Sequence, residues 1–169
     1  MRSPEKLKAT HDSTIQNAED WLQAVFSALG ASYAEGFSGL GLILYYPPLA
    51  LPVLPLSRSE STLPVPTGNL QEGVQLLRAL CQFDSPFHDG FHLVNASNLN
   101  ITHVSQFFSP PMPDIFPDLA TDRPIGARFM SAWLGSLLPA VCMTAILSRG
   151  EGGLVFTRGT VRTLFAPGK

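Results

Sequence analysis

Two short apolar runs, residues 39–46 and residues 140–147, constrain the fold of this chain more than any other feature. A helix that spans a bilayer needs about 20 apolar residues, so neither run is long enough to cross a membrane. Short apolar runs that end at turn residues are typical of buried strands. Two prolines end the first run, and a glycine-rich turn follows the second. We therefore expect both runs to be strands of a buried sheet.

Three other segments have the spacing of apolar residues that is typical of amphipathic helices. The first spans residues 13–29, with Asp12 or Ser13 as its N-cap and a glycine as its stop. The second follows Thr67, and the third spans about residues 124–137, with a proline in its first turn. In the second helix, the residues that we expect to be buried are Leu70, Val74, Leu77, Leu80 and Cys81.

An antiparallel hairpin is predicted in the middle of the chain. Residues 91–94 and 99–108 have strand composition, and residues 95–98 between them are typical of a turn. His92 and His103 should lie on its facing strands as a partly exposed pair.

The remaining segments complete a sheet. Because proline cannot donate a hydrogen bond to a neighbouring strand, residues 49–66 should form only an edge strand or a loop. Residues 109–122, with four prolines, should form an irregular exposed loop. Residues 154–157 and 160–165 are two further strands. We predict a single α/β domain over residues 13–169, after a flexible leader at residues 1–12, with a central mixed sheet of six or seven strands flanked by helices.

Charge is scarce in this chain. Charged residues make up 14% of the sequence, and acids and bases are mixed along it to a net charge of −2. This pattern has no basic footprint for a nucleic-acid backbone, so no nucleic-acid partner is expected. The shortage of charge predicts an apolar surface kept for a partner, or else a coat of uncharged loops built from the 15 prolines and 14 glycines. Both alternatives stay open.

The start of the sequence is polar and charged, without the apolar stretch of a signal peptide. We expect a cytoplasmic protein with no membrane partner. Cys81 and Cys142 lie far apart and match no metal or redox spacing, so both should be buried thiols.

The sharpest local motif is His88-Asp89-Gly90. An imidazole beside a carboxylate, followed by a glycine that lets the backbone approach closely, suits a phosphate that carries a metal ion. His88 and Asp89 are the candidate metal ligands. Asp-Gly is also common in plain turns, and the motif alone favours that interpretation.

Two further segments have the composition of phosphate-binding sites. Gly126 precedes a helix start, where backbone N–H groups are unpaired, and Arg128 adds a guanidinium group. Ser148 opens a glycine-rich turn after a buried strand, where the ligand sites of α/β proteins assemble. Taken one at a time, these segments favour an ordinary helix entry and an ordinary hairpin turn.

In their order and spacing, the three segments together resemble the diadenylate cyclase domain, over about residues 36–165. Members of this family condense two ATP molecules into cyclic di-AMP at the interface of two face-to-face domains, with the help of a divalent metal. The resemblance implies a nucleotide-binding α/β domain, ATP as ligand or substrate, Mg²⁺ or Mn²⁺ as cofactor, and a homodimer.

The resemblance is carried by individual positions. Asp89 and Gly90 match the family's Asp-Gly-Ala motif, and His88 matches a histidine that commonly precedes it. Gly126 and Arg128 match the first and third residues of the signature Gly-Thr-Arg-His-Arg. The resemblance implies that Asp89 is catalytic if the protein is active. The implied nucleotide-binding residues are Asp89, Gly90, Phe91, Gly126, Ala127, Arg128 and Ser148. The implied metal ligands are His88 and Asp89, with Glu151 as a further candidate.

Other positions depart from the family. Ala127, Phe129 and Met130 stand in place of Thr, His and the second Arg of the signature, and Phe91 stands in place of Ala. Ser148 matches the serine of a Ser-Glu-Glu turn, but the two carboxylates are missing. Each lost donor to a charged group is worth ~1.5–3 kcal/mol.

We therefore expect an eroded active site that binds ATP or a cyclic dinucleotide as a sensor or regulatory module. The first alternative is a divergent active diadenylate cyclase, a nucleotidyltransferase in which Glu151, one residue late, serves the metal. The second is an interaction module that retains only the fold.

Overall fold

The computed structural model describes residues 4–30, 36–57, 63–114 and 125–166 of the 169. In these ranges the chain forms three helices and seven strands. The helices are α1 (Pro4–Gly30), α2 (Leu70–Leu80) and α3 (Ala127–Gly135). The strands are β1 (Leu40–Tyr45), β2 (Val53–Pro55), β3 (Phe91–Asn95), β4 (Asn100–Phe108), β5 (Val141–Ser148), β6 (Gly152–Thr157) and β7 (Thr160–Phe165).

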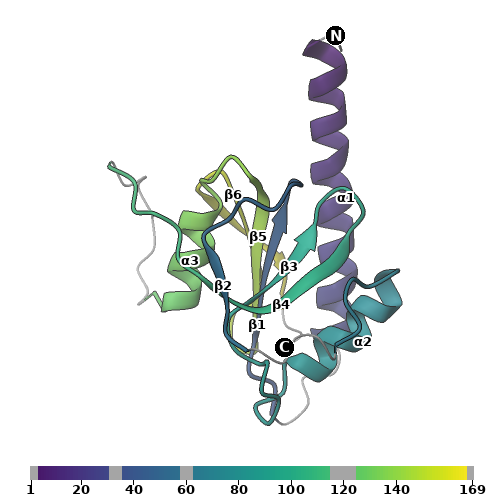
Figure 1. The fold of residues 1–169 in the computed structure, drawn as a ribbon, viewed down its shortest axis with the longest axis vertical. Coiled ribbons are helices and arrows are strands. Elements are labelled where there is room, and N and C mark those ends of the chain that lie inside the picture. Colours follow the sequence, from purple (N-terminus) through teal and green to yellow (C-terminus); the bar gives the residue numbers. More distant parts are fainter. Residues whose placement is uncertain (1–3, 31–35, 58–62, 115–124, 167–169) are drawn as a thin grey trace.

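All seven strands belong to one mixed sheet, in the order β2-β4-β3-β1-β5-β6-β7 (Figure 1). Strands β1 and β3 pair in parallel, and the other five pairings are antiparallel. The predicted α/β fold with a mixed sheet is confirmed. The prolines of residues 49–66 have the expected effect, because only the three-residue strand β2 forms there, at the edge of the sheet.

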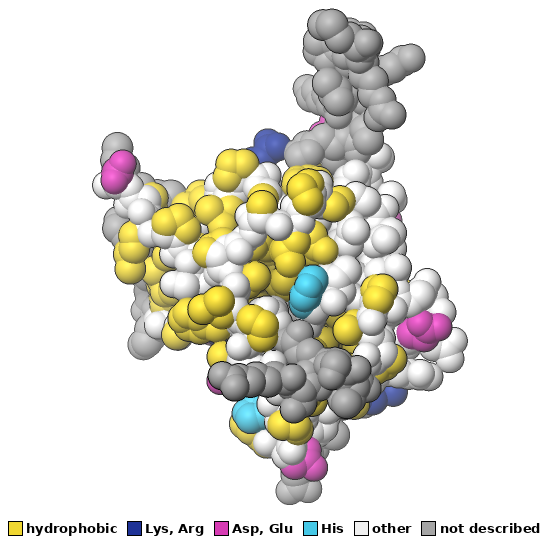
Figure 2. Space-filling model, viewed as in Figure 1, with side chains coloured by type: hydrophobic (Ala, Val, Ile, Leu, Met, Phe, Trp, Pro, Cys, Tyr) yellow, Lys and Arg dark blue, Asp and Glu magenta, His cyan; other side chains and the backbone are white. Residues whose placement is uncertain are grey.

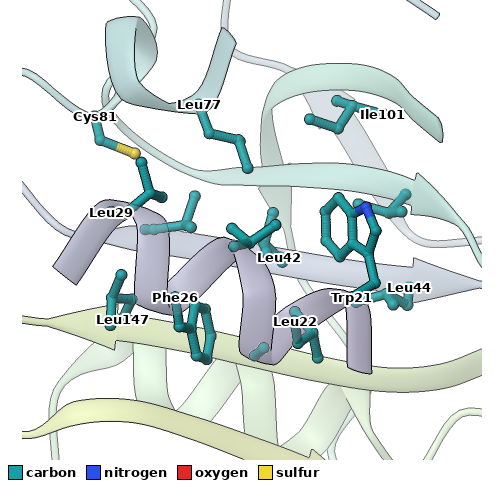
Figure 3. Packing of buried hydrophobic residues seen from close by; sticks show 14 of the residues in the cluster. Trp21, Leu22, Phe26, Leu29, Leu42, Leu44, Leu77, Cys81, Ile101 and Leu147 are labelled. Carbon is teal, nitrogen blue, oxygen red and sulfur yellow. The ribbon is translucent and has the colours of Figure 1, made fainter. Parts of the chain in front are cut away.

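The helices cover both faces of the sheet. Helices α1 and α2 pack on one face against alternate residues of β1, Leu42 and Leu44. Figure 3 shows Trp21, Leu22, Phe26 and Leu29 extending from α1 into this layer. Helix α3 packs on the other face, against Ile43 and Tyr45 of the same strand. Strand β1 is buried at all six positions because both of its faces are covered.

Helix α1 begins earlier than the sequence pattern indicates. It starts at Pro4, so residues 4–12 are helical where we expected a loose leader. Proline suits a first helical turn, and the Glu, Lys, Leu and Ala residues that follow are good helix formers. Asp12 and Ser13 are good caps, but they do not stop a helix that has already begun upstream.

Three side chains of α2 differ from the predicted buried stripe. Val74, which we expected to be buried, is only partly buried. Leu70 is 40% exposed, and Leu76, which we did not include, is buried. The side chain of Asn69 caps the helix by accepting from the backbone N–H of Glu72, so Leu70 is the first helical residue and lies on the outer side of the first turn. Leu77, Leu80 and Cys81 are buried as predicted.

The surface and the loops agree in part with expectation. Residues 109–114 have no regular structure, and the rest of the predicted loop lies outside the described residues. Apolar side chains are spread over the face seen in Figure 2, and Leu54 of β2 and its partner Phe107 of β4 are 66% and 51% exposed. Cys81 and Cys142 are buried free thiols, as predicted. Within the described ranges, no helix has the length and apolar character needed to cross a membrane.

The contact between α1 and β6 gives a test of this packing. A Cβ atom at Gly153 would collide with the ring of Phe26 and lie 3.0 Å from the Cβ of Phe165. We expect Gly153→Ala to lower the free energy of unfolding by about 1–3 kcal/mol, because the core has no room for the methyl group. Denaturant unfolding measures this. The control is Gly150→Ala in the preceding turn, where a Cβ meets nothing within 4 Å; equal stability of the two variants would contradict the packing.

Candidate functional site

The segments that the sequence singles out as candidate phosphate-binding sites lie at one end of the sheet. Strands β1 and β3 are parallel and in register, with Leu42 opposite His92, so both begin at this end. Strand β5 is antiparallel to β1, with Leu147 opposite Leu40, so it finishes there. The loop that carries Asp89 and the turn after Ser148 are therefore at the same end of the sheet.

Arg128, in the first turn of α3, meets Asp89 at this end. The distance from Arg128 Nη2 to Asp89 Oδ1 is 3.6 Å, and the two side chains are 30% and 77% exposed. The guanidinium group lies over Gly39, just before β1, where a Cβ would be 2.7 Å from Arg128 Nη1. Gly39 has a φ of +100°, so both its conformation and this close approach favour glycine. The structure thus brings together Asp89 and Arg128, which the sequence places far apart.

The Asp89-Gly90 turn is held by hydrogen bonds on both sides. The backbone N–H of Gly90 donates to Asp89 Oδ1 at 2.8 Å, and Ser105 Oγ of β4 donates to the Asp89 carbonyl at 3.1 Å. Gly90 has a φ of +80°, and a Cβ there would be 2.6 Å from the Gln106 carbonyl oxygen. This glycine is therefore required by the close packing of the loop on β4.

His92 supports this arrangement from inside the sheet. The prediction of a partly exposed His92–His103 pair is wrong for His92, which is 1% exposed. The backbone N–H of Ser105 donates to His92 Nδ1 at 3.1 Å, so the neutral ring carries its proton on Nε2. Ser105 has a φ of +49°. The first four residues of β3 are all buried, because α1 and α2 cover one face of the sheet and α3 covers the other, so neither face of the strand leaves His92 exposed.

The positive charge of Arg128 affects the pKa values of two buried groups, His92 and Cys81. Burial, and then the positive charge of Arg128, lower the pKa of His92 to about 3. Burial raises the pKa of Cys81 to about 12 against the opposing effect of Arg128. His92 is therefore neutral at physiological pH, and Cys81 is a thiol rather than a thiolate.

Phe91 is a core residue at this end. Its side chain is 4% exposed and makes an edge-to-face contact with Phe108, with ring centroids 5.6 Å apart. The ring also lies over Gly41 of β1, where a Cβ would be 2.9 Å from it. The Phe91 ring therefore fills the core and does not face the surface at this end of the sheet.

The start of α3 is open. Gly126 is its N-cap residue and makes no side-chain capping hydrogen bond, and a Cβ on it would meet nothing within 4 Å. Gly126 and Ala127 are both exposed. The N–H groups of a first helical turn have no partners within the helix and favour an anion, and Arg128 belongs to this same turn.

Ser148 and Glu151 belong to the turn between β5 and β6. Ser148 pairs with Gly152 at the end of the ladder, and its Oγ accepts from the backbone N–H of Glu151 at 3.3 Å. Glu151 is exposed. These contacts tie Ser148 and Glu151 to their own turn.

The candidate metal ligands His88 and Asp89 each have another partner in the structure. His88 Nδ1 donates to the Ser85 carbonyl at 2.7 Å, which leaves Nε2 as the ring's acceptor. Asp89 is paired with Arg128. Among the described residues, no group of three or more His, Cys, Asp or Glu side chains is placed to hold a metal ion. Mg²⁺ is often bound by one or two carboxylates together with substrate phosphates, so a metal here would depend on the ligand for most of its coordination.

Comparisons with known proteins bear on the fold. No family model matches the sequence, and the search of curated proteins found no match. A hypothetical membrane spanning protein from Bacillus cereus is similar in structure, with a TM-score of 0.58 at 16% identity; the alignment covers 85% of this chain but only 61% of that one. A double mutant of DacA, a diadenylate cyclase from Staphylococcus aureus, aligns with a TM-score of 0.49 at 15% identity over 94% of this chain and 91% of DacA. The first likeness concerns the fold alone, and the second is too distant to support an argument.

The buried histidine makes the stability of the protein depend on pH. Because the folded-state pKa of His92 lies below the ordinary value of 6.5, the unfolded state takes up a proton first as the pH falls. The contribution of neutral His92 to the free energy of unfolding is complete above about pH 6.5. As the pH falls below this value, the contribution is lost by up to about 1.4 kcal/mol per pH unit. Asparagine keeps an acceptor for the Ser105 N–H but does not titrate. Urea unfolding between pH 7.5 and pH 4 should therefore show a shallower loss for His92→Asn than for the wild type; parallel curves would contradict a buried neutral His92.

Proposed function

We propose that this domain binds a nucleotide, ATP or a cyclic dinucleotide, at the end of the sheet where Asp89 and Arg128 meet, and that it acts as a sensor or regulatory module rather than as an efficient cyclase. The observation that carries the proposal is the 3.6 Å approach of Arg128 to Asp89. These are the positions at which the sequence resembles the diadenylate cyclase domain.

The chemistry of this end of the sheet suits phosphate groups. Arg128 supplies a planar guanidinium that can hold two phosphate oxygens, and the open first turn of α3 offers backbone N–H groups beside it. The missing side chain of Gly39 lets the Arg128 guanidinium lie close to the backbone at the start of β1. The arrangement therefore offers several donors to an anion and one exposed carboxylate, Asp89, to a ribose hydroxyl or to a cation that arrives with the phosphates.

The residues that depart from the family are used for packing. Phe129 makes an edge-to-face contact with Phe156 of β6, with ring centroids 4.9 Å apart, and Met130 packs in the same core layer. A polar signature would supply a histidine and an arginine to the phosphates at these two positions. Their absence leaves fewer groups to stabilise a transition state, which supports ligand binding with little or no turnover.

Two other functions, a divergent cyclase and an interaction module, would give different results in the experiments below. A divergent cyclase would need Glu151 to join Asp89 at a metal ion, and an interaction module would need no ligand. The cytoplasmic location, the homodimer and the use of Mg²⁺ or Mn²⁺ stay predictions from the sequence and its resemblance.

Isothermal titration calorimetry with ATP and with cyclic di-AMP, each with and without Mn²⁺, tests the proposal. We expect binding of at least one nucleotide. Arg128→Gln should weaken it by about 10- to 100-fold, because a hydrogen bond to a charged group is worth ~1.5–3 kcal/mol. The matched control is Arg162→Gln on β7, which removes an arginine that pairs with Glu19 of α1 and should leave the affinity unchanged. No heat with any of these nucleotides would overturn the proposal.

Chromatography of an ATP incubation separates binding from catalysis. We expect no cyclic di-AMP above the level of an Asp89→Ala control. Product that forms with the wild type and disappears with Asp89→Ala would instead establish the divergent cyclase.

A further inference from the structure

A cavity of about 410 Å³ lies at the other end of the sheet from Asp89 and Arg128. It forms between the segment just after β1, the connection from α3 to β5, and the turn between β6 and β7, and its apolar wall comes from Leu137, Leu138, Pro139 and Val141. This volume is within the range of about 300–1,000 Å³ that is usual for small-molecule sites. The length of β1 separates the two ends of the sheet by about 20 Å.

The polar part of the cavity wall has one formal charge. Tyr46, Cys142 and Arg158 all line the cavity, and Tyr46 hydrogen-bonds to the sulfur of Cys142. Burial raises the pKa of Tyr46 and also the pKa of Cys142, although Arg158 opposes both shifts. Both groups are therefore neutral at physiological pH. A protonated, buried thiol is a poor nucleophile, so the Cys142 sulfur is not activated for covalent chemistry.

Arg158 occupies an unusual position for an arginine. It is the first residue of the two-residue turn between β6 and β7, and it has a φ of +50°, followed by Gly159 at +79°. Hairpin turns with two positive φ values strongly favour Asn-Gly or Asp-Gly, because other side chains are strained there. Backbone strain of this kind is concentrated at functional sites. The arginine is therefore unfavourable for the turn itself, while its side chain lines the cavity.

The turn is also fixed to the helix that borders the cavity. The backbone N–H of Arg158 donates to the Ser136 carbonyl at 3.1 Å, and the N–H of Gly159 donates to Ser136 Oγ at 3.0 Å. Trp133 Nε1 donates to the Gly159 carbonyl at 2.8 Å. These three bonds hold the backbone of the turn in place at the cavity mouth, so the guanidinium group starts from a fixed point.

We propose that this cavity binds a small organic anion, in which one carboxylate or phosphate group meets Arg158 and an apolar body lies against the leucine, proline and valine wall. Arg158 suits either anion because a guanidinium binds both carboxylates and phosphates with two parallel hydrogen bonds. The proposal does not depend on nucleotide binding, because it concerns different residues at the opposite end of the sheet.

The test uses three probes of similar shape: phenylacetate, phenyl phosphate and the neutral 2-phenylethanol. Titrations followed by ¹H–¹⁵N correlation spectra should give dissociation constants of about 1 mM or below for at least one anion. The amide shifts should centre on residues 46, 138, 141 and 158. The neutral alcohol should bind at least about 10-fold more weakly. The two anions distinguish a carboxylate ligand from a phosphate ligand.

Arg158→Asn is the informative variant because it creates a favoured Asn-Gly turn and so should not unfold the protein. We expect it to weaken anion binding at least about 10-fold while the melting temperature stays the same or rises by up to roughly 3 °C. Arg149→Gln removes the same charge from the turn at the opposite end of the sheet and should leave anion binding unchanged. The proposal is overturned if neither anion binds at 10 mM, if the alcohol binds as tightly as the anions, or if Arg158→Asn binds as tightly as the wild type.

Discussion

The burial of β1 on both of its faces is the constraint on which the rest of this structure depends. All six residues of the strand are buried, so α1 and α2 must cover one side of it and α3 the other. Its neighbours are β3 in parallel and β5 in antiparallel. That combination brings the start of β3 and the finish of β5 to one end of the sheet, beside the start of β1. The proximity of Asp89, Gly39 and Ser148 is a consequence of this topology.

Neighbouring residues in the first turn of α3 make two different kinds of contact. Arg128, in its first turn, faces Asp89, whereas Phe129 and Met130 pack against the sheet. A helix that presents a polar signature to phosphates over its whole first turn would need another way to cover this face. The first turn of α3 therefore presents one charged side chain to the end of the sheet and two apolar side chains to the core.

The sequence is sufficient to predict those features that depend on local chemistry. Apolar runs and turn residues predict the strands and the hairpin, and prolines predict the short edge strand. Features that depend on contacts between distant segments cannot be predicted from local chemistry. The burial of His92 depends on helices that cover both faces of β3, and we predicted Asp89 and Arg128 to share one site only because their motifs resemble those of a known family. The cavity at Arg158 could not be predicted at all, since three separate segments form its wall.

The proposed nucleotide site is the end of the sheet defined by Asp89 and Arg128. The most direct measurement is a crystal structure of the protein soaked with ATP. If a nucleotide binds there, we expect phosphate density within hydrogen-bond distance of the Arg128 guanidinium and the first N–H groups of α3. Nucleotide density at any other place on the protein, with the Arg128–Asp89 contact unchanged, would contradict it.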